Sequence, residues 1–184
     1  IVENLPVPLD RRVWQEARHL KLLGAEVSVI CPKMKGYTKS RETLEEIDIY
    51  RHPLPIEASG AIGYLMEYTT ALFFEFFLAV RIFFRKRFHV IQGCSPPDLI
   101  FLVALPFKLF DVKYVFDHHD LSPELFQTKF KGKNWLYKAL VFAEKMTFKT
   151  ADFSIATNQS FKEIAIQRGK MLPEIVEIVR SGPD

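Results

Sequence analysis

The apolar positions of this chain switch repeatedly between the period of a helix and the period of a strand. Val13, Ala17 and Leu20 recur at helical spacing before Gly24, and the apolar run that follows predicts a strand over residues 25–32. The later strands are expected at residues 47–54, 89–93, 113–116, 153–156 and 174–179, and the later helices at 62–84, 95–110, 136–150 and 159–168. Between the first two strands, the charged residues 33–46 are expected to form a loop. This alternation indicates an α/β fold, a Rossmann-like parallel sheet with right-handed crossovers and helices on both faces.

Residues 62–84 form the most apolar segment of the chain and are long enough to be considered as a membrane span. A membrane span needs about 20 apolar residues in a row. Glu67, Glu75 and Arg81 interrupt the segment, so we expect a helix that packs on the sheet and does not cross a bilayer. One stripe of this helix is expected to form the buried face: Phe73, Phe76, Phe77, Val80 and Phe84.

A second stripe of the same helix combines apolar and basic side chains. Phe74 and Leu78 align with Arg81 and Arg85, a pattern typical of helices that lie in a membrane interface. We expect a peripheral membrane contact there if the stripe is exposed. Alternatively, Phe74 and Leu78 are buried and the two arginines simply reach into water.

Composition narrows the class of protein. The 184 residues suffice for one domain with a core, and 48% hydrophobic with 26% charged residues is ordinary for a soluble globular protein. The 25 basic and 22 acidic residues give a net charge of +3, which provides no reason to expect a general nucleic-acid binder. Cys31 and Cys94 are single and far apart, so neither a disulfide framework nor a zinc site is indicated. We expect a cytoplasmic protein, at the inner face of the membrane if the interfacial stripe is used.

Both ends of the chain predict a fragment. The sequence opens at Ile1-Val2 and reaches a polar loop at once, as expected for a truncated first strand. It stops at Pro183-Asp184, just after an apolar run has ended. We expect residues 1–184 to be one lobe of a longer protein.

Four consecutive polar residues follow the apolar run 114–116: Asp117, His118, His119 and Asp120. Open α/β folds place their ligands at the carboxyl ends of such strands, and an imidazole between carboxylates can orient hydroxyls, donate to phosphate or exchange protons. Asp120 also suits the N-cap of a helix that begins at Leu121, so a purely structural explanation stays open. Neighbouring residues of an extended segment point to opposite sides, so His118 and His119 are not expected to hold one metal ion together.

Four stretches in this order resemble the amino-terminal domain of the glycosyltransferase family 4 enzymes, which have the GT-B fold. They are VPLDRRVWQEARHLKLLGAEVSVICP, GCSPPDL, FDHHDLSPELF, and TADFSIATNQSFKEIAIQRG followed by VEIVRSGPD. The resemblance spans nearly the whole chain. It implies that residues 1–184 are the acceptor-side lobe of a two-lobed enzyme whose donor-binding carboxy-terminal lobe is absent, and that the lobe alone is inactive.

The resemblance also implies a chemistry. Such enzymes transfer a sugar, typically a hexose, from a nucleotide-sugar donor to a glycan or lipid-linked acceptor, as in polysaccharide biosynthesis. They retain the anomeric configuration and need no metal ion or other cofactor. The family's histidine that supports the donor sugar falls on His119, with His118 as the alternate and Asp120 beside it. Stabilisation of developing charge by preset donors suits that role.

The first loop departs from the family pattern. Many members have a Gly-Gly pair there for the donor phosphates, whereas this chain has Asn4 and then Asp10, Arg11 and Arg12 at a helix start. Two arginines at that position oppose the helix dipole, which favours a phosphate or an anionic acceptor as their partner. Solvated arginines paired with Asp10 or Glu16 explain them equally well.

Two further residues follow strands at the same expected edge. Ser95 precedes a pair of prolines and is a candidate for substrate binding, as is Asn158, for which a helix cap is the more ordinary role.

Two other functions remain open at this point, a sugar-nucleotide 2-epimerase lobe of the same architecture and a non-catalytic binding module.

Overall fold

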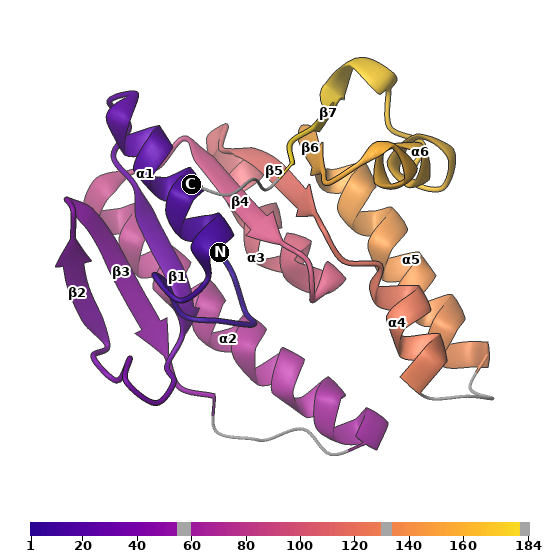
Figure 1. The fold of residues 1–184 in the computed structure, drawn as a ribbon, viewed down its shortest axis with the longest axis horizontal. Coiled ribbons are helices and arrows are strands. Elements are labelled where there is room, and N and C mark those ends of the chain that lie inside the picture. Colours follow the sequence, from indigo (N-terminus) through magenta and orange to yellow (C-terminus); the bar gives the residue numbers. More distant parts are fainter. Residues whose placement is uncertain (55–59, 130–133, 181–184) are drawn as a thin grey trace. The chain divides into compact units, whose positions relative to one another are not determined.

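The computed structural model describes residues 1–54, 60–129 and 134–180, and the chain forms two compact units (Figure 1). Unit 1 comprises Ile1–Arg87 and unit 2 comprises Phe88–Asp184. Each unit has a β-sheet of its own, with three strands in unit 1 and four in unit 2 among the described residues.

Unit 1 is a three-stranded sheet with two long helices. Its elements in chain order are α1 (Arg11–Leu22), β1 (Ser28–Pro32), β2 (Arg41–Leu44), β3 (Ile47–His52) and α2 (Gly60–Lys86). The strand order is β1-β3-β2, with β1 parallel and β2 antiparallel to β3. Figure 1 shows α1 on one face of this sheet and α2 on the other, so β3 is buried along its whole length. The expected helices on both faces are present here.

The expectation of a loop over residues 33–46 is wrong, because β2 lies within it. A tight turn through Glu45 and Glu46, both with positive φ, joins β2 to β3 in a hairpin. β2 is an edge strand, where charged side chains such as Arg41 and Glu42 can remain in contact with water. The sequence did not predict β2 because charged residues make up half of the strand. With β2 antiparallel to β3, the sheet of unit 1 is mixed and not purely parallel.

The buried face of α2 is not the stripe expected from its hydrophobic pattern. Phe73, Phe77 and Phe84 are 59%, 54% and 77% exposed. The side chains turned toward the core lie on the opposite face: Ala71, Glu75, Ala79, Ile82 and Phe83. The two alanines allow the helix to approach β1 and β3 closely, so small residues and not the largest apolar ones mark the packed face. In the described residues, no helix combines the length and apolar character needed to cross a membrane.

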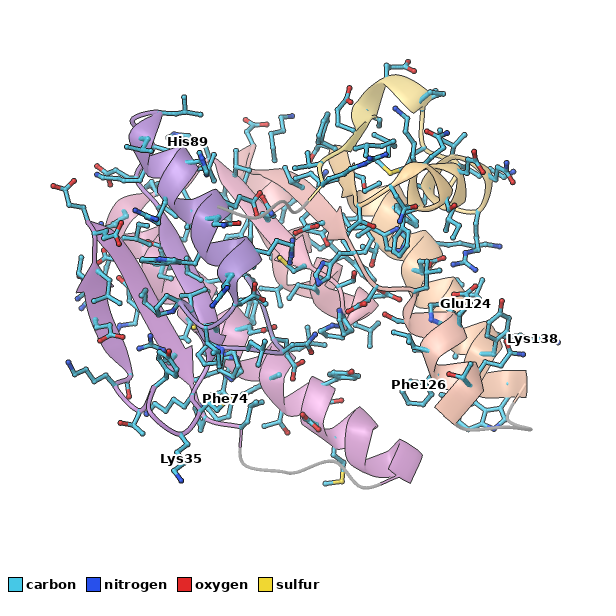
Figure 2. All side chains as sticks on the ribbon, viewed as in Figure 1. Lys35, Phe74, His89, Glu124, Phe126 and Lys138 are labelled. Atoms are coloured by element: carbon cyan, nitrogen blue, oxygen red, sulfur yellow. The ribbon has the colours of Figure 1, made fainter. Side chains whose placement is uncertain are left out.

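Phe74 and Leu78, from the second stripe, are half-buried on the flank of α2. Phe74 projects toward the sheet of unit 1 and stacks on His52, with ring centroids 6.3 Å apart (Figure 2). Arg81 and Arg85 are exposed. The aromatic side chains beside these cations are therefore Phe77 and Phe84 more than Phe74.

Unit 2 contains the all-parallel sheet that the alternating pattern predicts. Its strands are β4 (Val90–Cys94), β5 (Lys113–His118), β6 (Phe153–Ala156) and β7 (Val176–Ile178), and they lie side by side in chain order. The connections are η1 (Asp98–Ile100), α3 (Phe101–Ala104) and η2 (Leu105–Phe110), then α4 (Ser122–Lys129) and α5 (Asn134–Thr150), then α6 (Gln159–Gln167) and η3 (Pro173–Ile175). This α/β arrangement confirms the Rossmann-like fold class.

The helix expected over residues 95–110 is broken into η1, α3 and η2, three short pieces of which two are 3₁₀ helices. Pro106 lies in the first turn of η2 and has no N–H to continue an α-helical ladder. Asp111 then ends the segment in the left-handed conformation, with φ of 61°.

Candidate functional site

The site residues of unit 2 lie where β5 ends, and the alternation of a strand separates them into two groups. Phe116 and His118 share one face of β5, whereas Asp117 and His119 share the other. His118 is fully buried, and the His119 side chain is 18% exposed. The two imidazoles therefore lie in different environments, and only His119 reaches the surface of the unit.

His118 is part of the core of unit 2. Its ring stacks on Phe116 with centroids 5.5 Å apart and meets Phe148 and Phe161 at 5.1 Å and 5.0 Å. Its Nε2 atom lies 3.6 Å from Oε1 of Glu144, which is also fully buried. Burial by three aromatic rings gives His118 a packing role in the core, and its alternate catalytic role stays a prediction.

Beyond His118, a partly buried ionic network connects three helices. Arg168, directly after α6, binds Glu144 of α5 through Nη2 at 2.6 Å and also through Nε, and it binds Glu124 of α4 through Nη1 at 2.6 Å. Burial alone would lower the pKa of Arg168, but its two carboxylate partners outweigh burial and raise it. Figure 2 shows Glu124 projecting from α4.

Asp98 of η1 is a buried carboxyl group beside this network. Its Oδ1 atom accepts a hydrogen bond from the Ser122 hydroxyl at 3.1 Å, and its backbone carbonyl accepts one from Thr147. Burial, and after it the nearby carboxylate of Glu144, raises the pKa of Asp98 to about 8. Asp98 is therefore mostly protonated at neutral pH. Neither Asp98 nor Glu144 was predicted from the sequence, because their contacts come from residues 24 to 49 positions away.

The imidazole of His119 lies between two carboxylates. Its Nδ1 atom is 3.7 Å from Oδ1 of Asp117, and its Nε2 atom is 3.9 Å from Oδ2 of Asp120. The Asp117 side chain is 3% exposed and the Asp120 side chain 39%. Both distances exceed a normal hydrogen bond, so the carboxylates act on the ring through their charge.

Asp117 is a site residue that the sequence prediction left out. Its Oδ2 atom accepts a hydrogen bond from the Cys94 thiol at 3.4 Å, across the β4–β5 pair. The alternation of the strand could have indicated Asp117, because residues 117 and 119 share one face.

Ser95 is also at this edge, but it is 1% exposed. Its Oγ atom accepts the backbone N–H of His119 at 3.1 Å and that of Asp120 at 3.2 Å. These buried contacts give Ser95 a structural role at the end of β5, and binding of substrate by Ser95 stays a prediction.

A family model described as Glycosyltransferase Family 4 matches residues 9–184. The chain belongs to Glycosyltransferase Family 4. This confirms the resemblance of its four sequence stretches to that family, and the four-stranded parallel sheet of unit 2 is consistent with a lobe of the GT-B fold. A comparison with curated protein sequences finds no match.

Membership of Glycosyltransferase Family 4 makes the protein a glycosyltransferase-type lobe, and its general partners are a sugar donor and an acceptor. His119, Asp120 and Ser95 come together at the carboxyl edge of the parallel sheet, where this architecture places ligands. Asn158 follows β6, the neighbouring strand of that sheet. Its Oδ1 atom caps α6 by accepting the N–H groups of Ser160 and Phe161. The cap explains Asn158 without a ligand.

The other four predicted residues of this family 4 chain lie in unit 1, Asn4 in the segment before α1 and the other three at the start of that helix. Asp10 is the N-cap, and its Oδ1 atom accepts the N–H of Val13 at 3.1 Å. Asn4 and Arg11 are exposed, and Arg12 is half-buried. The first turn of α1 contains no acidic residue, so its positive end and the two guanidinium groups remain compatible with an anion.

Unit 1 also contains a buried acidic cluster that the sequence did not predict. Burial, and after it repulsion from Glu75 and Glu67, raises the pKa of Glu3 to about 8. Burial raises the pKa of Glu75 to about 7 and lowers that of His52, whose Nε2 atom lies 3.8 Å from Oε1 of Glu75. These shifts favour the uncharged forms, so the cluster is compatible with a core position.

Proposed function

We propose that this protein is a retaining glycosyltransferase that moves a hexose from a nucleotide-sugar donor to a glycan or lipid-linked acceptor. The observation that carries the proposal is His119, which is partly exposed at the carboxyl end of β5 and flanked by Asp117 and Asp120. As the bond between the sugar and the leaving phosphate breaks, positive charge develops on the sugar. An imidazole held in place beside the sugar hydroxyls stabilises that charge with little reorganisation.

No protein nucleophile and no metal ion enter this proposal. The nucleotide sugar is a substrate, and His119 acts as a hydrogen-bonding and electrostatic group. Arg11 and Arg12 supply positive charge for the donor phosphates or for an anionic acceptor.

The test is hydrolysis and transfer by the full-length protein with a panel of UDP-, GDP- and ADP-linked hexoses. We expect one donor to be hydrolysed fastest, with the same rate after treatment with EDTA, and the product to keep the anomeric configuration of the donor by NMR. Inversion, or activity that EDTA abolishes, would contradict the mechanism.

The same assay separates the two alternative functions. Release of the 2-epimer of the donor sugar would identify a sugar-nucleotide 2-epimerase. Saturable binding of a nucleotide sugar by the full-length protein, with neither transfer nor hydrolysis, would identify a binding module.

We further propose that the described residues supply the acceptor side of the cleft and that a second lobe positions the donor. Binding energy from that lobe is needed to align the reacting atoms. Residues 1–184 alone are therefore expected to transfer no sugar under conditions in which the full-length protein does. Equal turnover by the two would refute this division of labour.

We propose that the enzyme works at an anionic membrane surface, consistent with a lipid-linked acceptor. The exposed face of α2 carries Phe73, Phe77 and Phe84 beside Arg81 and Arg85. Aromatic side chains can enter the headgroup region while each nearby cation adds about 1 kcal/mol of attraction to an anionic leaflet.

The exposed face of α5 has a similar character. Trp135 and Phe142 are 69% and 65% exposed, and Lys138, Lys145 and Lys149 are exposed on the same side of the helix. Lys138 projects from α5 into solvent in Figure 2. This face therefore combines exposed aromatic side chains with three positive charges, and α5 is a second candidate for the membrane contact.

Co-sedimentation with phosphatidylcholine vesicles containing increasing phosphatidylglycerol tests both faces. We expect binding by the full-length protein that grows with anionic lipid, weakens with salt, and falls in a variant with Phe77→Ser, Arg81→Glu and Arg85→Glu. Lys138→Glu with Lys145→Glu tests α5 in the same way. A variant with Lys35→Glu and Lys170→Glu, both exposed elsewhere, is the charge-matched control. Indifference to lipid charge in the wild type would refute the membrane contact.

A further inference from the structure

Ser95 stands at an unusual point of the sheet in unit 2. It follows the last residue of β4, and its own N–H extends the parallel ladder by donating to the carbonyl of Asp117 at 3.0 Å. Ser95 is therefore held beside the end of β5 by the backbone of both strands.

The Ser95 hydroxyl takes the place of a backbone acceptor. β5 ends at His118, so the N–H groups of His119 and Asp120 lie beyond the paired register of β5 with its neighbours. Ser95 Oγ accepts both, at 3.1 Å and 3.2 Å, in a site where Ser95 is 1% exposed. The carbonyls of Asp117 and Asp120, at 3.4 Å and 3.5 Å, are the acceptors available for the hydroxyl proton.

The neighbouring residue of β4 acts on the same segment in a different way. The Cys94 thiol contacts the carboxylate of Asp117, and the other oxygen of that carboxylate faces Nδ1 of His119. Two consecutive residues, Cys94 at the end of β4 and Ser95 directly after it, thus hold the carboxylate beside the His119 ring and the backbone that carries the ring.

We propose that Ser95 is a positioning residue that fixes the backbone at His119 and Asp120 and so sets the direction of the His119 imidazole. This inference rests on the proposed role of His119 in sugar transfer. Ser95 itself touches no substrate. Without its oxygen, two adjacent N–H groups at the end of a buried strand lose their acceptor, and the peptide units there are free to rotate.

The first test measures the hydrogen bonds from the N–H groups of His119 and Asp120 to Ser95 directly, and it needs no substrate. In the full-length protein with Ser95→Ala, we expect amide hydrogen exchange at His119 and Asp120 to accelerate by about 10-fold or more, since both lose a buried acceptor. Exchange in β6 should change little. Ser95→Cys, which keeps a weaker acceptor, should give an intermediate effect. Unchanged exchange at His119 and Asp120 in Ser95→Ala would overturn the proposal.

Ser154→Ala is the matched control. Ser154 is a fully buried serine of the same sheet, and its hydroxyl donates to the carbonyl of Phe116 at 3.0 Å. Loss of that hydroxyl removes one buried hydrogen bond without touching the N–H groups of His119 and Asp120. We expect Ser154→Ala to lower stability while leaving exchange at those two amides unchanged.

The second test is a double-mutant cycle on activity, with the nucleotide sugar that the wild type hydrolyses fastest. Ser95→Ala should lower kcat by about 10-fold to 100-fold with little change in KM, because misplacing a group that acts in the transition state has effects of that size. In a His119→Ala background, Ser95→Ala should cost almost nothing more. A full additional loss there would show that Ser95 acts independently of His119 and would overturn the proposal.

The two tests also separate this inference from the proposed function. If His119→Ala alone leaves kcat unchanged, the role of His119 in transfer fails. The exchange measurement would still decide whether Ser95 holds the backbone of His119.

Discussion

The Nδ1 atom of His119 lies 3.7 Å from Oδ1 of Asp117, a carboxylate that is almost completely buried. We predict that Asp117→Asn lowers kcat by at least ~10-fold, less than the ~10²-fold expected for loss of the histidine itself. The amide keeps the size of the side chain but removes the negative charge beside the ring.

Asp120→Asn is the natural comparison, because Asp120 is more exposed and its carboxylate is 3.9 Å from Nε2. Water screens an exposed charge, so its loss should matter less. Steady-state kinetics of the two variants check the order, and a larger effect at Asp120 would contradict it.

The two adjacent histidines should differ in what their loss changes. We predict that His119→Ala lowers kcat by about 10² or more while the fold stays intact, as expected for one charge-stabilising donor. His118→Ala should instead lower the free energy of unfolding by about 2–5 kcal/mol, because it empties a space among three aromatic rings. Denaturant unfolding and kinetics of both variants test this. The assignment fails if His118→Ala proves the more damaging to kcat in correctly folded protein.

Asp98 should make stability depend on pH. Its pKa in the folded protein is about 8, well above the ~3.9 of an unfolded aspartate, so folded Asp98 holds a proton that unfolding releases. The free energy of unfolding should therefore decrease as pH rises from about 5 to 8, by up to ~1.4 kcal/mol per pH unit from this group.

Asp98→Asn removes that titration, and its stability should decline less steeply than that of the wild type over the same range. Glu3 and Glu75 also have raised pKa values, but the wild type and the Asp98→Asn variant both contain them. The difference between the two stability curves therefore isolates Asp98. Asp111→Asn, at an exposed aspartate, is the control. Parallel curves for wild type and Asp98→Asn, from urea unfolding at several pH values, would show that Asp98 does not bind the extra proton.

The Arg168 network gives a prediction about pairing. Arg168→Met leaves the fully buried Glu144 without its main partner and should lower the free energy of unfolding by about 3–5 kcal/mol. Adding Glu144→Met to Arg168→Met should recover most of that free energy. Glu124 is 39% exposed and can be hydrated when Arg168 is absent. Thermal and urea unfolding measure both variants. A double variant that is less stable than Arg168→Met alone would contradict this prediction and would mean that the apolar replacements cannot pack.

Where local pattern and packing agree, the sequence predicts this structure well. The apolar run before Asp117 predicts β5, and Gly24, with φ of +88°, ends α1 at the expected place. β6 occupies the expected residues 153–156. In these segments the signal lies within a few neighbouring residues, and the tertiary contacts do not oppose it.

The errors come from features that depend on distant partners. α2 is apolar around most of its surface, so hydrophobicity could not show that Ala71 and Ala79 pack while Phe73 and Phe77 face outward. The structural role of Ser95 also depends on distant partners, because the two N–H groups that its hydroxyl accepts come from residues 24 and 25 positions later. The local sequence around a short polar side chain at a strand end does not show whether that side chain faces a ligand or the backbone of a neighbouring strand.

The strand order of unit 2 has a consequence for how the protein is made. Because β4, β5, β6 and β7 lie side by side in the order of synthesis, each new strand finds its neighbour already in place. The sheet can grow by one strand at a time as the chain leaves the ribosome, without threading a late strand between two earlier ones. In unit 1, by contrast, β3 must pair with β1 on one side and with β2 on the other. Because β3 is the last of the three strands in sequence and lies between the other two, that sheet cannot grow by adding each new strand at its edge.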